Sequence, residues 1–179
     1  AVGTAALGGV IPQTVPVLED GSIDIEVAIG KVKSDDMHFP RTKLLCLENT
    51  YNGKPLSPKY MQCATAAARK VNLRSHLDGA RLMNAAIANK CTPRELASSF
   101  DTVSLCLSKG LGAPVGSVLV GNQDFINEAR RVRKMLGGGM RQAGILAACG
   151  IVAMKNQVDR LIQDHALAAR LASELAQIP

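Results

Sequence analysis

Short apolar segments alternate with longer stretches of helical periodicity along this chain, and that alternation constrains its fold more than any other feature. The apolar segments are about five residues long, the usual length of a buried strand. This order favours an α/β fold, a three-layer sandwich in which helices cover a mainly parallel sheet. The predicted strands are residues 43–48, 73–77, 103–107 and 116–120, and the predicted helices are residues 23–32, 58–70, 79–89, 93–99, 123–136, 141–156 and 157–177.

The composition is that of a globular chain with one core. Of 179 residues, 47% are hydrophobic and 20% charged. No segment reaches the run of about 18 apolar residues that a membrane-spanning helix needs, so we expect no membrane association. The five cysteines are scattered without CxxC spacing, which argues against a disulfide framework and against a metal site. A reducing compartment, the cytosol, is the predicted location.

The net charge of +6 raises the question of nucleic-acid binding. The strongest basic cluster lies within residues 130–134, where it alternates with apolar residues at helical spacing. That pattern is typical of a solvated basic face over a buried stripe. Three phenylalanines and two tyrosines leave few rings for base stacking. We therefore expect no nucleic-acid partner, and contact with an anionic ligand remains the alternative for this cluster.

Lys109 is the candidate reactive residue. It follows the apolar segment 103–107 and precedes two closely spaced glycines, Gly110 and Gly112. A lysine in such a place is often a solvated turn residue. At the carboxyl end of a buried strand it can instead border a crevice of low dielectric, where desolvation disfavours the ammonium form and frees the nitrogen as a nucleophile. Such an amine can form a Schiff base.

Asp78 and Arg81 follow another predicted strand and open the next helix. Because the carboxyl ends of parallel strands meet at one edge of a sheet, the segments 48–49, 78–81 and 108–109 should converge on one crevice. A carboxylate there can keep a heteroaromatic nitrogen protonated, which a pyridoxal ring needs in order to accept electrons. A lysine, an aspartate and an arginine make that set.

Several motifs resemble one family, the low-specificity L-threonine aldolases, which are pyridoxal-phosphate enzymes of the aspartate aminotransferase fold, fold type I. The motifs are LLCLENTYNGKPLS, DMHFPRT, HLDGARLMNAA, FDTVSLCLSKGLGAPVGSVLVG and RKMLGGGMRQAGILAA. The resemblance runs from about residue 7 to the end of the chain, and family members are roughly twice this long. It implies a shortened chain: residues 1–155 as part of the large cofactor-binding domain, and 156–179 as a helix leading to a small domain.

The resemblance also implies roles for individual residues. Lys109 would hold pyridoxal 5'-phosphate, Asp78 would pair with the ring nitrogen, and Arg81 would contact the ring hydroxyl oxygen and orient the substrate. Ser108 would contact the phosphate. The substrate would be a 3-hydroxy amino acid such as threonine or allo-threonine, cleaved between Cα and Cβ into glycine and an aldehyde.

Two further roles depend on the resemblance more strongly. His38 lies in a loop, where a histidine is most often a hydrogen-bonded surface group; the family motif makes it the acceptor of the β-hydroxyl proton. Arg141 follows Gly137–Gly139, which by itself indicates a helix break. The resemblance places Arg141 on the cofactor phosphate of a neighbouring subunit, in a homo-oligomer built as a dimer of dimers. An arginine suits that task because its planar fork binds phosphate bidentately.

Two other functions stay open. A β-eliminating lyase of the same fold would also need Lys109 and Asp78, but would expel a leaving group from Cβ. A catalytically impaired, truncated homologue would act only by pairing with another subunit. His76 and His165 show no partners at metal-ligand spacing and are expected to be structural.

Overall fold

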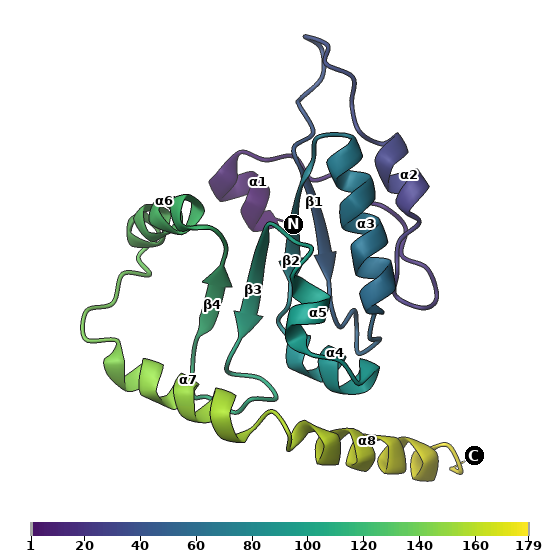
Figure 1. The fold of residues 1–179 in the computed structure, drawn as a ribbon, viewed down its shortest axis with the longest axis vertical. Helices are drawn as coiled ribbons and strands as arrows, with labels where there is room; N and C mark the ends of the chain where they lie inside the picture. The colour runs from purple at the N-terminus through teal and green to yellow at the C-terminus, as the bar shows by residue number, and fades with distance from the viewer. Residues whose placement is uncertain (1, 179) are drawn as a thin grey trace.

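The structure, a computed structural model, describes residues 2–178 and is built on one four-stranded sheet of order β1-β2-β3-β4 (Figure 1). Strand β1 spans Leu44–Glu48, β2 Arg74–Asp78, β3 Thr102–Cys106 and β4 Ser117–Val120. The first three strands run parallel, and β4 is antiparallel to β3. The prediction of an α/β fold with a mainly parallel sheet is confirmed, and each strand lies within one residue of its predicted bounds.

Helices fill the connections in the predicted order. Six of the seven predicted helices are shorter than the periodicity suggested; for α4 and α8 the reason is that turns occupy residues 79–81 and 157–160 before them. The first helix, α1, was not predicted. The bounds are α1 Val2–Gly8, α2 Ile25–Gly30, α3 Pro58–Lys70, α4 Leu82–Asn89, α5 Pro93–Ala97, α6 Gln123–Met135, α7 Gly144–Asn156 and α8 Leu161–Leu175.

Capping side chains fix where the helices that flank the sheet begin. Ser57 accepts a hydrogen bond from the amide of Tyr60 at the start of α3, directly before a proline. At α5, the sequence Thr92-Pro93-Arg94-Glu95 predicts a reciprocal capping box, and the structure contains it, with the Glu95 carboxylate 2.7 Å from the Thr92 amide nitrogen. Each such cap contributes about 1 kcal/mol to helix stability.

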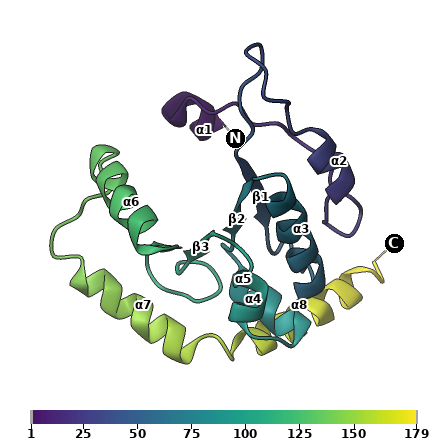
Figure 2. The same cartoon turned by 45° about the horizontal axis from the view of Figure 1, so that its top comes forward.

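One face of the sheet carries the main core. Alternate side chains of the strands point to this face and pack against α3, α4 and α5. Figure 2 shows these helices on one side of the molecule, with α6 and α7 lying apart from them. The buried cluster comprises Leu47, Leu56, Met61, Ala64, Leu77, Leu82, Ala85, Ala86, Leu96, Phe100 and Val103.

The opposite face of the sheet is open among the described residues. Residues paired in register across neighbouring strands point to the same face, so the exposed side chains of this face form adjoining rows. The exposed members are Leu44, Cys46, Arg74, Asp78, Ser117 and Leu119. Strands β1, β2 and β3 therefore bury residues on one face only, and all four residues of β4 are exposed.

A second, smaller apolar cluster joins the segment after β3 to three helices. Leu111 and Ala113 pack with Met83 of α4, Ala153 of α7 and Leu161 of α8. This cluster fixes the position of residues 107–113 relative to α4 and α8. Within residues 2–178, no helix is both long and apolar enough to cross a membrane.

Candidate active site

The carboxyl ends of β1, β2 and β3 lie side by side at the lower edge of the sheet in Figure 1. Glu48 pairs in register with Asp78, and Asp78 pairs with Ser104. The amide of Asn49 donates to the carbonyl of Asp78 over 3.0 Å, and the amide of Gly79 donates to the carbonyl of Ser104 over 2.8 Å. These bonds continue the sheet past its last paired residues, so the segments that follow the strands begin next to one another.

The side chain of Asn49 links this edge of the sheet to the loop that follows β1. Its side chain is fully buried and exchanges two hydrogen bonds with the backbone of Leu56: Nδ2 donates to the carbonyl and Oδ1 accepts from the amide, each over 3.0 Å. A buried amide that satisfies its donor and its acceptor locks the local chain path. The sequence placed Asn49 at a strand end, but no pattern in it indicated this bracing role.

The Asp78 carboxylate is exposed at the end of β2. One oxygen, Oδ1, accepts the amide of Ala80 over 3.0 Å, and no described residue bonds the other. His76, two residues earlier, is half-buried, with Nδ1 at 2.8 Å from Oγ1 of Thr102. Burial lowers the pKa of His76 below its ordinary value, and the charge of Asp78 opposes that shift. Asp78 thus has a free acceptor, whereas the ring of His76 contacts the hydroxyl of Thr102.

Gly79, the residue directly after β2, lies close against the backbone of β3, and this contact leads to a testable prediction. A Cβ at this position would lie 2.8 Å from the backbone oxygen of Ser104 and 3.2 Å from Cβ of Leu82. Gly79→Ala should therefore lower the free energy of unfolding by about 1–3 kcal/mol, as overpacking against backbone does. Urea denaturation measures the change.

The control is Gly144→Ala at the start of α7, where a Cβ would meet nothing within 4 Å. This variant should be neutral or slightly more stable, since alanine is the better helix former. Equal unfolding midpoints for the two variants would contradict the tight contact at Gly79.

Lys109 lies in a turn after β3. The carbonyl of Lys109 accepts the amide of Gly112 over 2.9 Å, and the carbonyl of Leu107 accepts the amide of Ala113 over 3.0 Å. Both Ser108 and Lys109 are exposed, and the Lys109 amine has no hydrogen bond or ion pair with residues 2–178. The expected crevice of low dielectric is therefore not formed by the described chain, because the helices cover only the other side of the sheet.

A thiol lies beside this turn. Sγ of Cys106 is 3.4 Å from Oγ of Ser108, and the pKa of Cys106 falls below the ordinary thiol value. The hydrogen bond with Ser108 is the main cause, and the nearby positive charge of Lys109 adds to it. The strand end thus favours an anion next to Lys109.

Alkylation should favour this thiol over those of Cys46 and Cys91. Burial raises the pKa of Cys46 and of Cys91, so near pH 7.5 a larger fraction of Cys106 is thiolate, the reactive form. We expect iodoacetamide to label Cys106 several-fold faster than the other two, as peptide mass spectrometry would measure. Ser108→Ala should slow the labelling of Cys106 alone; unchanged labelling would contradict the assigned cause.

Arg81 is close to Asp78 in the chain and in the structure. It stands at the boundary where α4 begins, three residues after Asp78, and its side chain is exposed without a bond to any described residue. The structure therefore presents an amine, a carboxylate and a guanidinium from the ends of two adjacent strands. None of these three charged groups is engaged in an ion pair among the described residues.

Arg141 and His38 lie elsewhere. Arg141 is exposed in the connection between α6 and α7, which runs along the left of Figure 1, away from β1 and β2. The loop 31–43 that carries His38 precedes β1 and so projects from the opposite edge of the sheet, at the top of Figure 1. The His38 side chain is 80% exposed, with Nδ1 at 2.8 Å from Oδ1 of Asp36. Among the described residues, no hydrogen bond or ion pair joins either side chain to the turn of Lys109; His38 is paired with Asp36 instead.

The basic cluster of α6 is exposed as expected, but the stripe beneath it is not buried. The described structure buries no residue of α6. The prediction of a buried stripe was therefore wrong for this chain, because no other described element packs over these side chains. The basic residues are Arg130, Arg131, Arg133 and Lys134, and the apolar ones are Ala129, Val132, Met135 and Leu136.

Known proteins similar in sequence to this chain include L-threonine aldolases. The sequence model of the beta-eliminating lyase family matches residues 1–179. The chain is 51% identical over 177 residues to the low specificity L-threonine aldolase of Escherichia coli K12, covering 99% of this chain and 53% of that protein. It is 46% identical to a probable low-specificity L-threonine aldolase 2 of Arabidopsis thaliana, covering 98% and 51%. The chain spans about half the length of these relatives.

Solved structures agree in fold. The threonine aldolase of Leishmania major superposes with a TM-score of 0.76 at 24% identity, covering 89% of this chain and 48% of that one. A putative L-allo-threonine aldolase of Listeria monocytogenes gives 0.74 at 20% identity, covering 90% and 44%. At these identities the likeness establishes a shared fold.

Proposed function

The chain belongs to the beta-eliminating lyase family, and we propose that it serves in a pyridoxal-phosphate-dependent aldolase that cleaves L-threonine and L-allo-threonine to glycine and an aldehyde. The observation that carries the proposal is the placement of Asp78, Arg81 and the Lys109 turn at the ends of two adjacent parallel strands. The identity of 51% to a low specificity L-threonine aldolase supports the choice of reaction.

The donor set fits pyridoxal phosphate. The cofactor presents an aldehyde, a ring nitrogen, a ring hydroxyl and a phosphate, and this edge of the sheet presents an amine, a carboxylate, a guanidinium and a hydroxyl with no ion pair between them. When bound, pyridoxal phosphate supplies a protonated ring that takes up the electrons released as the Cα–Cβ bond breaks. In keeping with the chemistry of that set, Lys109 would hold the cofactor covalently.

The other side chains of this edge have electrostatic tasks in the proposal. Asp78 would hold a proton on the ring nitrogen through its free oxygen, since the charge of a carboxylate favours the protonated partner. Arg81 would hydrogen-bond the ring hydroxyl oxygen and help to orient the substrate. Ser108, whose hydroxyl already lies beside Cys106, would donate to the phosphate.

Two roles extend beyond this edge. We propose that Arg141 binds the cofactor phosphate of a neighbouring copy, in a dimer of dimers that shares its sites between subunits. His38 would accept the proton of the substrate β-hydroxyl; its support is the resemblance of the motif, as its loop lies at the other edge of the sheet within one chain. We also propose a cytosolic location. For the domain organisation, we propose that residues 1–155 form part of the large domain and that residues 156–179 form a linking segment.

Two assays separate the candidate reactions. The purified chain is mixed with pyridoxal phosphate and given L-threonine, L-allo-threonine or L-serine in parallel. Acetaldehyde and glycine from the first two substrates would support the aldolase. Pyruvate and ammonia from serine, without threonine cleavage, would instead support a β-eliminating lyase. Cofactor binding with neither product would support the catalytically impaired homologue.

A further inference from the structure

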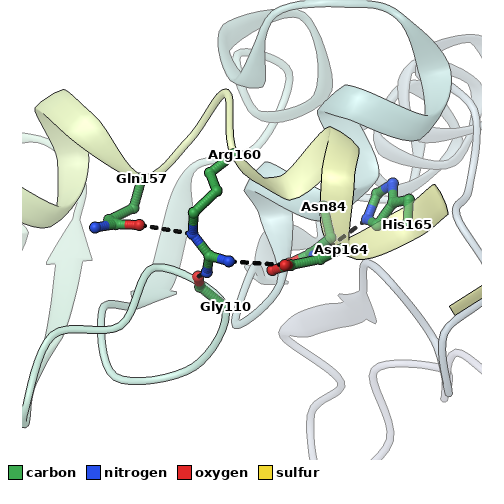
Figure 3. A network of polar contacts seen from close by, with 6 residues as sticks. All are labelled: Asn84, Gly110, Gln157, Arg160, Asp164 and His165. Carbon is green, nitrogen blue, oxygen red and sulfur yellow. Dashed lines mark hydrogen bonds and ion pairs between the residues drawn. The ribbon is translucent and has the colours of Figure 1, made fainter. Parts of the chain in front are cut away.

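Arg160 connects the start of α8 to the turn that carries Lys109. Its guanidinium contacts three acceptors: Nε donates to Oε1 of Gln157 over 2.7 Å, Nη1 to Oδ1 of Asp164 over 2.8 Å, and Nη2 to the carbonyl of Gly110 over 3.4 Å (Figure 3). Gly110 is the residue next to Lys109. The first two contacts orient the guanidinium, and the third directs its charge at the backbone of the turn.

The same turn is held by packing. A Cβ on Gly110 would lie 2.9 Å from Cδ2 of Leu161 and 3.4 Å from Oδ1 of Asn84, so α8 and α4 both touch this backbone. Leu161 is fully buried. Nδ2 of Asn84 is 3.2 Å from Nε2 of His165, which ties the two helices together beside the turn (Figure 3). The sequence had indicated no partner for His165, and this is its partner.

The contacts fix the backbone on the carboxyl side of Lys109. Its own carbonyl is bonded to the amide of Gly112, and the carbonyl of Gly110 is bonded to Arg160. We propose that Arg160 is a positioning residue that holds the Lys109 turn in place for cofactor binding. The inference rests on the proposed function, because it gives Lys109 the role assigned there. A lysine side chain is flexible, so its amine can be held in one position only if the backbone that carries it is fixed.

A purely helical role for Arg160 is the competing explanation, and the chain contains its control. Arg160 and Asp164 form an i,i+4 pair at the start of α8, and Arg170 and Glu174 form the same pair near its end, with 2.7 Å between Nε and Oε1. Such pairs stabilise a helix to a similar small extent. Arg170 touches no residue of the turn among the described contacts. Only Arg160 adds the bond to Gly110.

The test compares Arg160→Met with Arg170→Met. In the cofactor-free chain we expect the rate of amide exchange at Gly112 to rise roughly three- to fivefold in Arg160→Met and to stay unchanged in Arg170→Met. A charge-assisted hydrogen bond at a partly exposed site protects an amide by about that factor. With pyridoxal phosphate added, Arg160→Met should bind it more weakly by a similar factor. The visible circular dichroism per bound cofactor should also fall, since it reports how rigidly the ring is held.

Arg160→Lys supplies the rescue. It keeps the charge but lacks the planar fork that reaches three acceptors, so it should restore part of the exchange protection and of the dichroism. Equal effects of Arg160→Met and Arg170→Met, or none in either, would overturn the positioning role. If the parent chain fails to bind pyridoxal phosphate, the proposed function fails, while exchange at Gly112 still decides whether Arg160 holds the turn.

Discussion

Lys109→Ala should abolish the absorbance above about 400 nm that pyridoxal phosphate develops on a protein amine, and should reduce threonine cleavage by about a thousandfold or more. The physical reason is that Lys109 lies in the turn after β3, the strand next to β2, and its amine has no partner among the described residues, whereas the amine of Lys54 after β1 donates to the carbonyl of Glu19. Absorbance after mixing with the cofactor measures the first effect. Borohydride reduction followed by peptide mass spectrometry locates the modified lysine.

Lys155→Ala is the matched control. Lys155 is an exposed lysine of α7, and its replacement removes the same charge without touching the strand ends. The control should retain the band and its modified peptide at Lys109. A band of equal height in Lys109→Ala and the parent would show that the cofactor binds elsewhere, and the proposed site would then be wrong.

Asp78→Ala should lose aldolase activity by on the order of a hundredfold to a thousandfold while keeping measurable cofactor binding. A carboxylate beside the ring nitrogen stabilises the charge that develops as the bond breaks, and preorganised charges of this kind have effects of that size. Binding survives because Lys109 and Ser108 are untouched. Steady-state kinetics with threonine, at saturating cofactor, gives the comparison.

Asp78→Asn separates charge from structure at the same position. Its amide oxygen can still accept the amide of Ala80, the bond that Asp78 makes through Oδ1, so the turn is preserved while the charge is lost. If charge matters, Asp78→Asn and Asp78→Ala should be impaired alike. Near-normal turnover in either variant would exclude the assigned role of Asp78.

The elements of the fold were largely predictable because local rules set them. The strands were found from short apolar runs, and α5 from the capping box of Thr92 and Glu95, which the structure contains. The adjacency of the strand ends follows from parallel pairing alone. Helix starts such as that of α4 were misplaced, since the turn 79–81 is dictated by the contact of Gly79 with Ser104 in a distant strand.

What the sequence could not show were features that arise only from packing. The exposure of Lys109 depends on which faces of the sheet the helices cover, and no local pattern encodes that. The bracing of Leu56 by Asn49 and the contact of Arg160 with Gly110 join residues whose partners cannot be named before the fold is known. The exposed apolar stripe of α6 could not be predicted either, because periodicity indicates that a helix has an apolar face but not which element packs against that face.

The placement of β4 has a practical consequence for handling the protein in solution. It is the last strand of the described sheet, it has one paired neighbour, and all four of its residues are exposed, among them Val118, Leu119 and Val120. Backbone donors and acceptors along such a rim offer a template for a strand of another molecule. Preparations of this chain should therefore self-associate more readily as concentration rises, and dilute samples suit the spectroscopic measurements best.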